Sequence, residues 1–188
     1  MTTIHSTTLN LFGLFLPLTL AIGCVSPGLE GRVQALEREA DRQAVTRLMY
    51  AYAHGIDGFD EALLRTAFAE DAVAEYKGVN FPMDLRLEGI DAIVEWLKSS
   101  VGHRKEAAPW HYMSTALVEV GIDGDKDRAT LKTFQHNRTM SGVGVYSVEA
   151  RRTPGGWRIA KLHLDERLLD AELLESMDDE AGRDFPIK

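Results

Sequence analysis

The chain has 188 residues, of which 45% are hydrophobic and 27% are charged. A chain of this length has enough apolar material for one domain with a core, and too little for two. The formal net charge is −8 at pH 7, and the 21 lysine and arginine residues are scattered along the sequence. This distribution argues against a phosphate-binding surface, so nucleic acid is not expected as a partner. The single cysteine, Cys24, excludes an internal disulfide and a metal site built on several thiolates.

The first 28 residues differ in character from the rest of the chain. Residues 9–22 are largely apolar and carry no charge, and a Ser-Pro-Gly break follows at residues 26–28. The apolar run is short for a membrane-spanning helix and has the length of the hydrophobic part of a secretory signal. Residues 21–24 also resemble a bacterial lipobox, which is cleaved before its cysteine. We therefore expect residues 1–28 to be a signal or a lipoprotein-like leader that attaches the protein to a membrane through lipidated Cys24.

The leader also decides the expected location of the protein. A working signal would direct the chain to the cell envelope or out of the cell. Residues 1–8 contain no lysine or arginine, however, whereas signals usually begin with positive charge. The alternative is a disordered apolar leader on a cytoplasmic protein.

Helical periodicity dominates the next part of the chain. From Leu29 to Tyr52, apolar residues recur every three or four positions with charged residues between them, which predicts a long amphipathic helix. Gly55 and Gly58 are expected to end this helix. Asp60 occupies the N-cap position of a second helix, predicted over residues 61–69.

Strands alternate with one more helix in the remainder of the domain. A strand is predicted over residues 72–76, with a hairpin partner over 85–88 and a helix over 89–98. Period-two alternation then predicts four long strands separated by turn-forming residues. Their ranges are 111–122, 128–140, 143–152 and 157–168. An acidic tail follows over residues 171–188, either frayed or as a short polar helix.

Helices followed by long strands predict an α+β fold, in which helices cover one face of a strongly bent antiparallel sheet. A bent sheet closed by helices forms a cone. The interior of such a cone is a natural apolar pocket for a small molecule. We expect residues 29–170 to form this domain.

Several sequence motifs are similar to those of one family. They are residues 47–57 (RLMYAYAHGID), 68–73 (FAEDAV), 111–115 (HYMST), 123–125 (DGD) and 156–160 (GWRIA). Together they resemble the SnoaL-like branch of the nuclear transport factor 2-like superfamily, over residues 33 to 170. The resemblance implies a cystatin-like roll, and homo-oligomers that often pair through the outer face of the sheet. The superfamily includes dehydratases, isomerases, cyclases, epoxide hydrolases and non-catalytic binders, so its fold alone does not fix a function.

The resemblance also implies a set of site residues. Scytalone dehydratase, bile acid dehydratase and hexachlorocyclohexane dehydrochlorinase types share an aspartate after the first helix and a histidine opening the third strand, and Asp57 and His111 match these positions. Tyr76 matches a pocket tyrosine of the dehydratases, Tyr52 a tyrosine of bile acid dehydratase, and His136 the second histidine of scytalone dehydratase. Two departures matter: Ile56 replaces a tyrosine of scytalone dehydratase, and Tyr52 replaces the dehydrochlorinase lysine that assists the departing chloride.

An aspartate and a histidine in a dry pocket can carry out an elimination. A carboxylate on one imidazole nitrogen fixes the tautomer and raises basicity, so the other nitrogen can take a proton from carbon next to a carbonyl. Tyr52 and Tyr76 could bind the developing oxyanion. His111 could return its proton to a leaving hydroxyl, or His136 could supply one. This chemistry needs neither a metal nor an organic cofactor.

Other interpretations of the same residues remain open. Asp57 between two glycines is typical of a turn, His111 could be a histidine at a strand edge, and His136 shares a strand face with charged residues. Tyr52 and Tyr76 could simply pack in the core.

Three functions therefore follow from the sequence. The first is a cofactor-independent, dehydratase-like lyase acting on a small hydrophobic carbonyl compound of polyketide, steroid or aromatic type. The second is an isomerase or dehydrochlorinase that uses the same pair. The third is a non-catalytic ligand-binding or dimerisation module. An enzyme requires the His111 ring to lie within hydrogen-bonding reach of Asp57 inside a cavity.

Overall fold

A computed structural model describes residues 27–101, 110–137 and 142–169. The predicted tail over residues 171–188 lies outside these ranges. So does the predicted leader, Cys24 included, apart from Pro27 and Gly28 at the start of the first helix. Among the described helices, none combines the length and the apolar character needed to cross a membrane.

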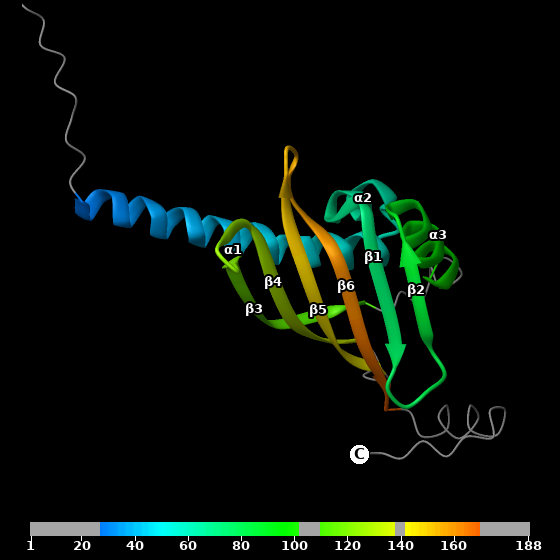
Figure 1. The fold of residues 1–188 in the computed structure, drawn as a ribbon. Coiled ribbons are helices and arrows are strands. Elements are labelled where there is room, and N and C mark those ends of the chain that lie inside the picture. Colours follow the sequence, from blue (N-terminus) through cyan, green and yellow to red (C-terminus); the bar gives the residue numbers. More distant parts are fainter. Residues whose placement is uncertain (1–26, 102–109, 138–141, 170–188) are drawn as a thin grey trace, which may run out of the picture.

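The first helix, α1, spans Pro27–Asp57 and is the longest element of the fold. Its N-terminal half extends away from the sheet (Figure 1), so apolar residues there are exposed, as at Leu36 (71%). The helix ends directly before Gly58, as predicted, whereas Gly55, also expected at its end, lies inside the helix. A Cβ atom at Gly55 would lie 2.8 Å from Leu64. The glycine therefore serves the close packing of the second helix against the first.

The second helix, α2, spans Glu61–Ala67, and Asp60 caps it by accepting a hydrogen bond from the backbone N–H of Leu63 at 2.9 Å. The cap position predicted from the sequence is confirmed. Strand β1 (Phe68–Gly78) follows at once, so it begins where the sequence predicted helix. The hairpin partner is also confirmed, as β2 (Asp84–Glu88) pairs antiparallel with β1. Helix α3 spans Ile90–Val101.

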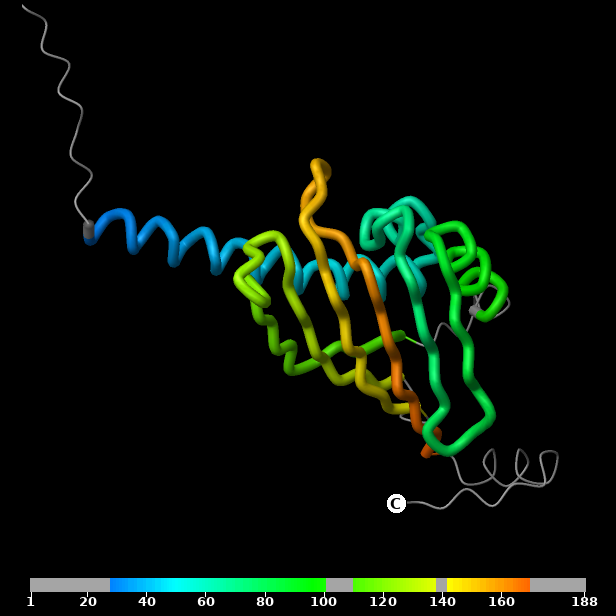
Figure 2. The backbone as a smooth tube through the Cα atoms, viewed as in Figure 1, coloured from blue at the N-terminus to red at the C-terminus, as the bar shows by residue number. Residues whose placement is uncertain are grey.

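Four long strands complete a six-stranded sheet of order β2-β1-β6-β5-β4-β3. They are β3 (Tyr112–Ile122), β4 (Asp125–His136), β5 (Gly142–Thr153) and β6 (Gly156–Leu168). The sheet curves strongly around the helices (Figure 2), which confirms the predicted α+β architecture. One feature of the prediction is wrong: β1 pairs with β6 in parallel, so the sheet is mixed and not wholly antiparallel.

The core lies between the inner face of the sheet and the helices. Helix α1 packs against β3, β4 and β6, and α3 packs against β1 and β2. From Ala129 on, strand β4 alternates: Leu131 and Gln135 are buried on the inner face, whereas Lys132 and Phe134 are exposed on the outer face. The largest hydrophobic side chains that are completely buried are those of Val45, Met49, Tyr52, Ile93, Val94, Leu131, Tyr146, Ile159 and Leu162.

A polar contact fixes α1 to the sheet. Asp41 accepts a hydrogen bond from the indole N–H of Trp157 at 3.0 Å and pairs with the guanidinium of Arg152 at 2.7 Å. Replacing Asp41 with alanine should cost about 1.5–3 kcal/mol of unfolding free energy, because a charged acceptor is lost and two donors are left without it. Chemical denaturation of both proteins measures this difference. Glu39→Ala is the control, since Glu39 is exposed and pairs with Gln43 and Arg42 on the surface of its own helix.

The contribution of Asp41 to the free energy of unfolding should depend on pH. Burial acts to raise the pKa of this carboxyl, but the hydrogen bonds from Arg152 and Trp157 outweigh it and hold the pKa below the ordinary value of 3.8. A carboxyl with a lowered pKa in the folded state stabilises the protein above the unfolded-state pKa, and this stability is lost as the pH falls through the folded-state pKa. The difference between wild type and Asp41→Ala should therefore shrink below about pH 4. If the difference in unfolding free energy stayed constant down to pH 2, this prediction would be contradicted.

Candidate active site

Asp57 and His111 meet where α1 ends and β3 is about to begin. The Nδ1 atom of His111 lies 2.8 Å from Oδ1 of Asp57, and the backbone N–H of His111 donates to Oδ2 at 2.7 Å. The side chains are mostly buried, with exposed fractions of 15% for His111 and 17% for Asp57. The carboxylate thus orients both the ring and the backbone of His111. Because Nδ1 is occupied, Nε2 is the ring nitrogen available to a ligand.

His111 lines a cavity of about 230 Å³ between the helices and the inner face of the sheet. Much of the wall is apolar, from Ile56 on α1, Trp96 and Leu97 on α3, and Leu164 on β6. A cavity of this size admits a small molecule. The lining residues among those described are Tyr52, Ile56, Tyr76, Met83, Trp96, Leu97, Ser100, His111, Gln135, Asn137, Tyr146, Leu164 and Glu166.

Three buried tyrosines form a hydroxyl cluster at this cavity. The hydroxyl of Tyr52 lies 3.3 Å from that of Tyr76 and 3.2 Å from that of Tyr146. Burial is the largest cause that raises the pKa of each phenol well above its ordinary value. All three are therefore protonated at neutral pH. Two of the three hydroxyl hydrogens suffice for the two internal bonds, so one remains to be donated to a ligand oxygen.

Sequence reasoning found Tyr52 and Tyr76 and missed Tyr146. The signal was present, because alternation along β5 puts Tyr146 on the same face as the apolar Val148 and Ala150. The polar cavity residues Gln135, Asn137 and Glu166 were missed as well. Their strands were predicted, but nothing in the sequence indicated that these side chains converge.

The structure separates His136 from the other predicted site residues. Strand alternation turns Gln135 into the cavity and His136 to the other face of β4. The His136 ring stacks on Tyr112, with ring centroids 4.9 Å apart, and its Nδ1 lies 3.1 Å from the carbonyl oxygen of Asn137. Placing His136 beside His111 in one pocket was therefore wrong. Across the described ranges, no cluster of three or more His, Cys, Asp or Glu side chains is arranged to hold a metal ion.

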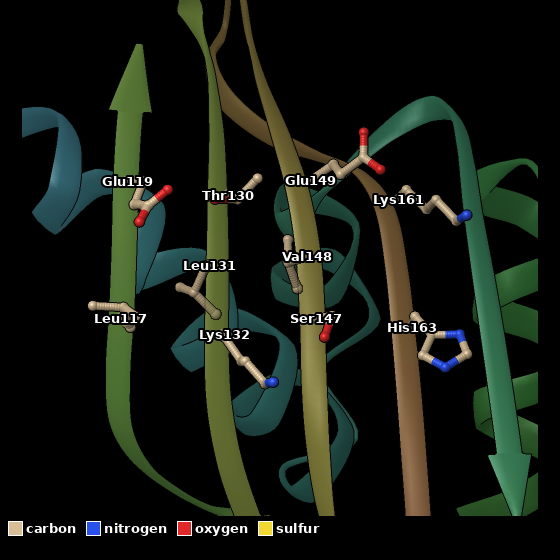
Figure 3. Close-up of a pocket in the computed structure, with 10 residues that line it drawn as sticks. All are labelled: Leu117, Glu119, Thr130, Leu131, Lys132, Ser147, Val148, Glu149, Lys161 and His163. Carbon is tan, nitrogen blue, oxygen red and sulfur yellow. The ribbon is translucent and has the colours of Figure 1, made fainter. Parts of the chain in front are cut away.

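A second hollow, of about 410 Å³, lies on the outer face of the sheet (Figure 3). Charges of both signs surround it, from Glu119, Lys132, Glu149 and Lys161. His163 at its edge faces Glu75 and Asp165 at 3.4 and 3.1 Å. This surface has the character of a solvated sheet face and lies across the sheet from His111.

Solved structures with similar folds come from several bacteria. A hexachlorocyclohexane dehydrochlorinase, LinA-type3 of Novosphingobium barchaimii, is 20% identical, with 70% of this chain and 90% of that chain covered and a TM-score of 0.55. A cystatin-like, NTF2-like protein of Novosphingobium aromaticivorans is 24% identical (82% and 98% covered, TM-score 0.53). A cystatin-like protein of unknown function from Nostoc punctiforme is 16% identical (70% and 93% covered, TM-score 0.53).

At these identities the similarity shows a shared fold and not a shared reaction. Comparison with curated protein sequences gives no match. The sequence itself shows a clearer relationship to a known family. The family model of the SnoaL-like domain matches residues 37–163, a span that includes α2, α3, the first five strands and both Asp57 and His111. The chain therefore belongs to the SnoaL-like domain family.

Proposed function

We propose that this protein is a cofactor-independent lyase that eliminates water from a small hydrophobic carbonyl compound. One observation carries the proposal: Asp57 holds His111 through two hydrogen bonds, one with Nδ1 of the imidazole and one from the backbone N–H, at the wall of a largely apolar cavity. A histidine oriented in this way is suited to general acid–base chemistry. The volume of about 230 Å³ suits a substrate of roughly one ring and a short side chain.

The first step is removal of a proton from the carbon next to the carbonyl. Nε2 of His111 takes the proton, the C–H electrons form an enolate, and Asp57 stabilises the resulting imidazolium. The enolate oxygen accepts the hydrogen bond that the tyrosine cluster has left to donate. In a buried, low-dielectric site such a bond is stronger than in water.

The second step expels the hydroxyl group from the β-carbon. The carbonyl re-forms as the enolate electrons move into a carbon–carbon double bond and the carbon–oxygen bond breaks. Hydroxide is a poor leaving group, so the proton on Nε2 of His111 transfers to it and water departs. One histidine thus accepts a proton from carbon and returns it to oxygen, which leaves His111 ready for the next substrate.

The character of the cavity favours loss of water over loss of chloride. Chloride leaves as an anion and is helped by a nearby cation, but no lysine or arginine lines the cavity among the described residues. Water leaves as a neutral molecule once it is protonated. An isomerase would use the same first step and return the proton to another carbon.

The aldol adduct of acetone and benzaldehyde provides a direct test. It carries a carbonyl, a β-hydroxyl and an aromatic ring, and its dehydration product, benzylideneacetone, absorbs strongly in the ultraviolet. Wild-type protein should accelerate the appearance of this enone over buffer, and should do so in the presence of a chelator. The corresponding β-chloro ketone serves as comparison. Acceleration of the chloro compound alone would favour a dehydrochlorinase, and acceleration of neither would favour a non-catalytic binding module.

A further inference from the structure

We propose that Gln135, Asn137 and Glu166 form a polar subsite that binds a hydroxyl group at the unreactive end of a neutral substrate. The subsite lies in the same cavity as His111. The inference therefore rests on the proposed function, and it specifies the class of substrate that the enzyme would take. It would select hydroxylated carbonyl compounds, such as phenolic ketones, over their deoxy or alkylated counterparts.

Strand pairing brings two of these residues to one place. Gln135 on β4 pairs with Gly144 on β5, and Gly144 in turn pairs with Glu166 on β6. Residues directly opposite one another in a sheet project to the same face. Gln135 and Glu166 therefore point into the cavity from both sides of a position that has no side chain.

The glycines on β5 make room for the polar groups. A Cβ atom at Gly144 would lie 3.2 Å from Nε2 of Gln135, so the amide extends over the glycine. A Cβ atom at Gly142 would lie 2.9 Å from Oε1 of Glu166 and 3.1 Å from Nδ2 of Asn137. Two amides and a carboxylate thus gather above a pair of glycines, in space that ordinary side chains would fill.

The Gln135 amide has unused hydrogen-bonding capacity. The residue is 5% exposed, and its buried Oε1 has no hydrogen-bond partner within the described part of the chain. A buried acceptor without a partner is costly, and a ligand that supplies a donor removes that cost. Rotation of the amide exchanges Oε1 and Nε2, so Gln135 can offer either an acceptor or a donor. A hydroxyl group, which both donates and accepts, complements this set.

Charge narrows the substrate class further. The carboxylates of Glu166 and Asp57 both place negative charge close to the cavity, and each contributes to raising the pKa of Tyr146. No lysine or arginine among the described residues lines the cavity to balance them. A carboxylic acid or phosphate would enter against this charge, whereas a neutral hydroxyl would not.

The test compares p-hydroxy and p-methoxy forms of the aldol adduct of acetone and benzaldehyde. Both have nearly the same shape, but only the first can donate a hydrogen bond from the ring. Wild-type protein should prefer the p-hydroxy adduct by about tenfold in kcat/KM, mainly through KM. In Gln135→Leu this preference should fall to about one. An unchanged preference in Gln135→Leu would overturn the subsite.

A second variant keeps the subsite testable if Gln135→Leu does not fold. Gly142→Ala places a methyl group against the ends of two flexible side chains, Glu166 and Asn137, so the strand can tolerate it while the subsite cannot. It should also reduce the preference for the p-hydroxy adduct. Val143→Ala on the opposite face of β5 is the control and should retain the preference.

Binding measurements separate this inference from the proposed reaction. Quenching of tryptophan fluorescence, with Trp96 in the cavity wall, reports binding of the unreactive enones p-hydroxy- and p-methoxybenzylideneacetone. One possible result is that no adduct is dehydrated, but the p-hydroxy enone binds more tightly than the p-methoxy enone and loses this advantage in Gln135→Leu. That result would support the subsite and contradict the lyase. Dehydration without any hydroxyl preference overturns the subsite and leaves the lyase intact. Absence of binding by both enones also overturns the subsite.

Discussion

Replacing His111 with alanine is expected to lower the turnover of the acetone–benzaldehyde adduct at least ~100-fold. His111 is the group that both takes the proton from carbon and returns it to the leaving hydroxyl, so its loss affects both steps. The variant should remain folded, because the side chain lines a cavity and the backbone N–H of residue 111 can still donate to Asp57. Steady-state rates of enone formation, at matched concentrations of folded protein, measure the effect.

His163→Ala is the matched control for this experiment. His163 lies on the outer face of the sheet (Figure 3). Its ring nitrogens lie 3.4 Å from Glu75 and 3.1 Å from Asp165. Its replacement should leave turnover within about twofold of wild type, since surface changes away from the site have small effects. A His111→Ala protein that turned over the adduct as fast as His163→Ala would sink the assignment of His111.

The second large effect is expected for Asp57→Asn, which should reduce kcat by about 1,000-fold. Asparagine keeps the size of the side chain but loses the charge that stabilises the imidazolium. It can also turn its NH₂ group toward Nδ1 of His111 and so favour the wrong tautomer. The backbone N–H of His111 can still donate to the asparagine oxygen, so the fold should be preserved.

Measurements of kcat and of thermal unfolding for Asp57→Asn separate the two roles of this residue. A turn residue that only ends α1 would affect the unfolding temperature and leave kcat unchanged. An orienting carboxylate would affect kcat and leave the unfolding temperature nearly unchanged. Turnover within tenfold of wild type in a folded Asp57→Asn protein would show that Asp57 is a turn residue only.

Much of the fold could be predicted from periodicity. The spacing of apolar residues in α1 and the alternation in the long strands are local signals, so the structure confirms these elements. The parallel pairing of β1 with β6 could not be predicted in this way, because the two strands are far apart in the sequence. Gly55 shows a similar limit: a glycine near a helix end suggests a cap, but here it makes room for Leu64 on a second helix.

The site was predictable to a different degree at each residue. Asp57 and His111 were identified through a family resemblance, and the structure brings them within hydrogen-bonding distance. For His136 the family resemblance predicted a place in the pocket, whereas strand alternation predicted a place on the opposite face of the sheet. The inner face of β4 carries the apolar Ala129 and Leu131, and Gln135 follows them in the same period. The local pattern was therefore the better guide at this position.

The most direct test of the central claim, that His111 takes a proton from carbon next to a carbonyl, is hydrogen exchange in a ketone that cannot eliminate. Benzylacetone lacks a β-hydroxyl group, so in D₂O a base in the cavity can only exchange its α-hydrogens, which proton NMR follows. Wild-type protein should accelerate this exchange over buffer, and His111→Ala should not. Equal exchange with both proteins, or no exchange above buffer with wild type, would contradict the role assigned to His111.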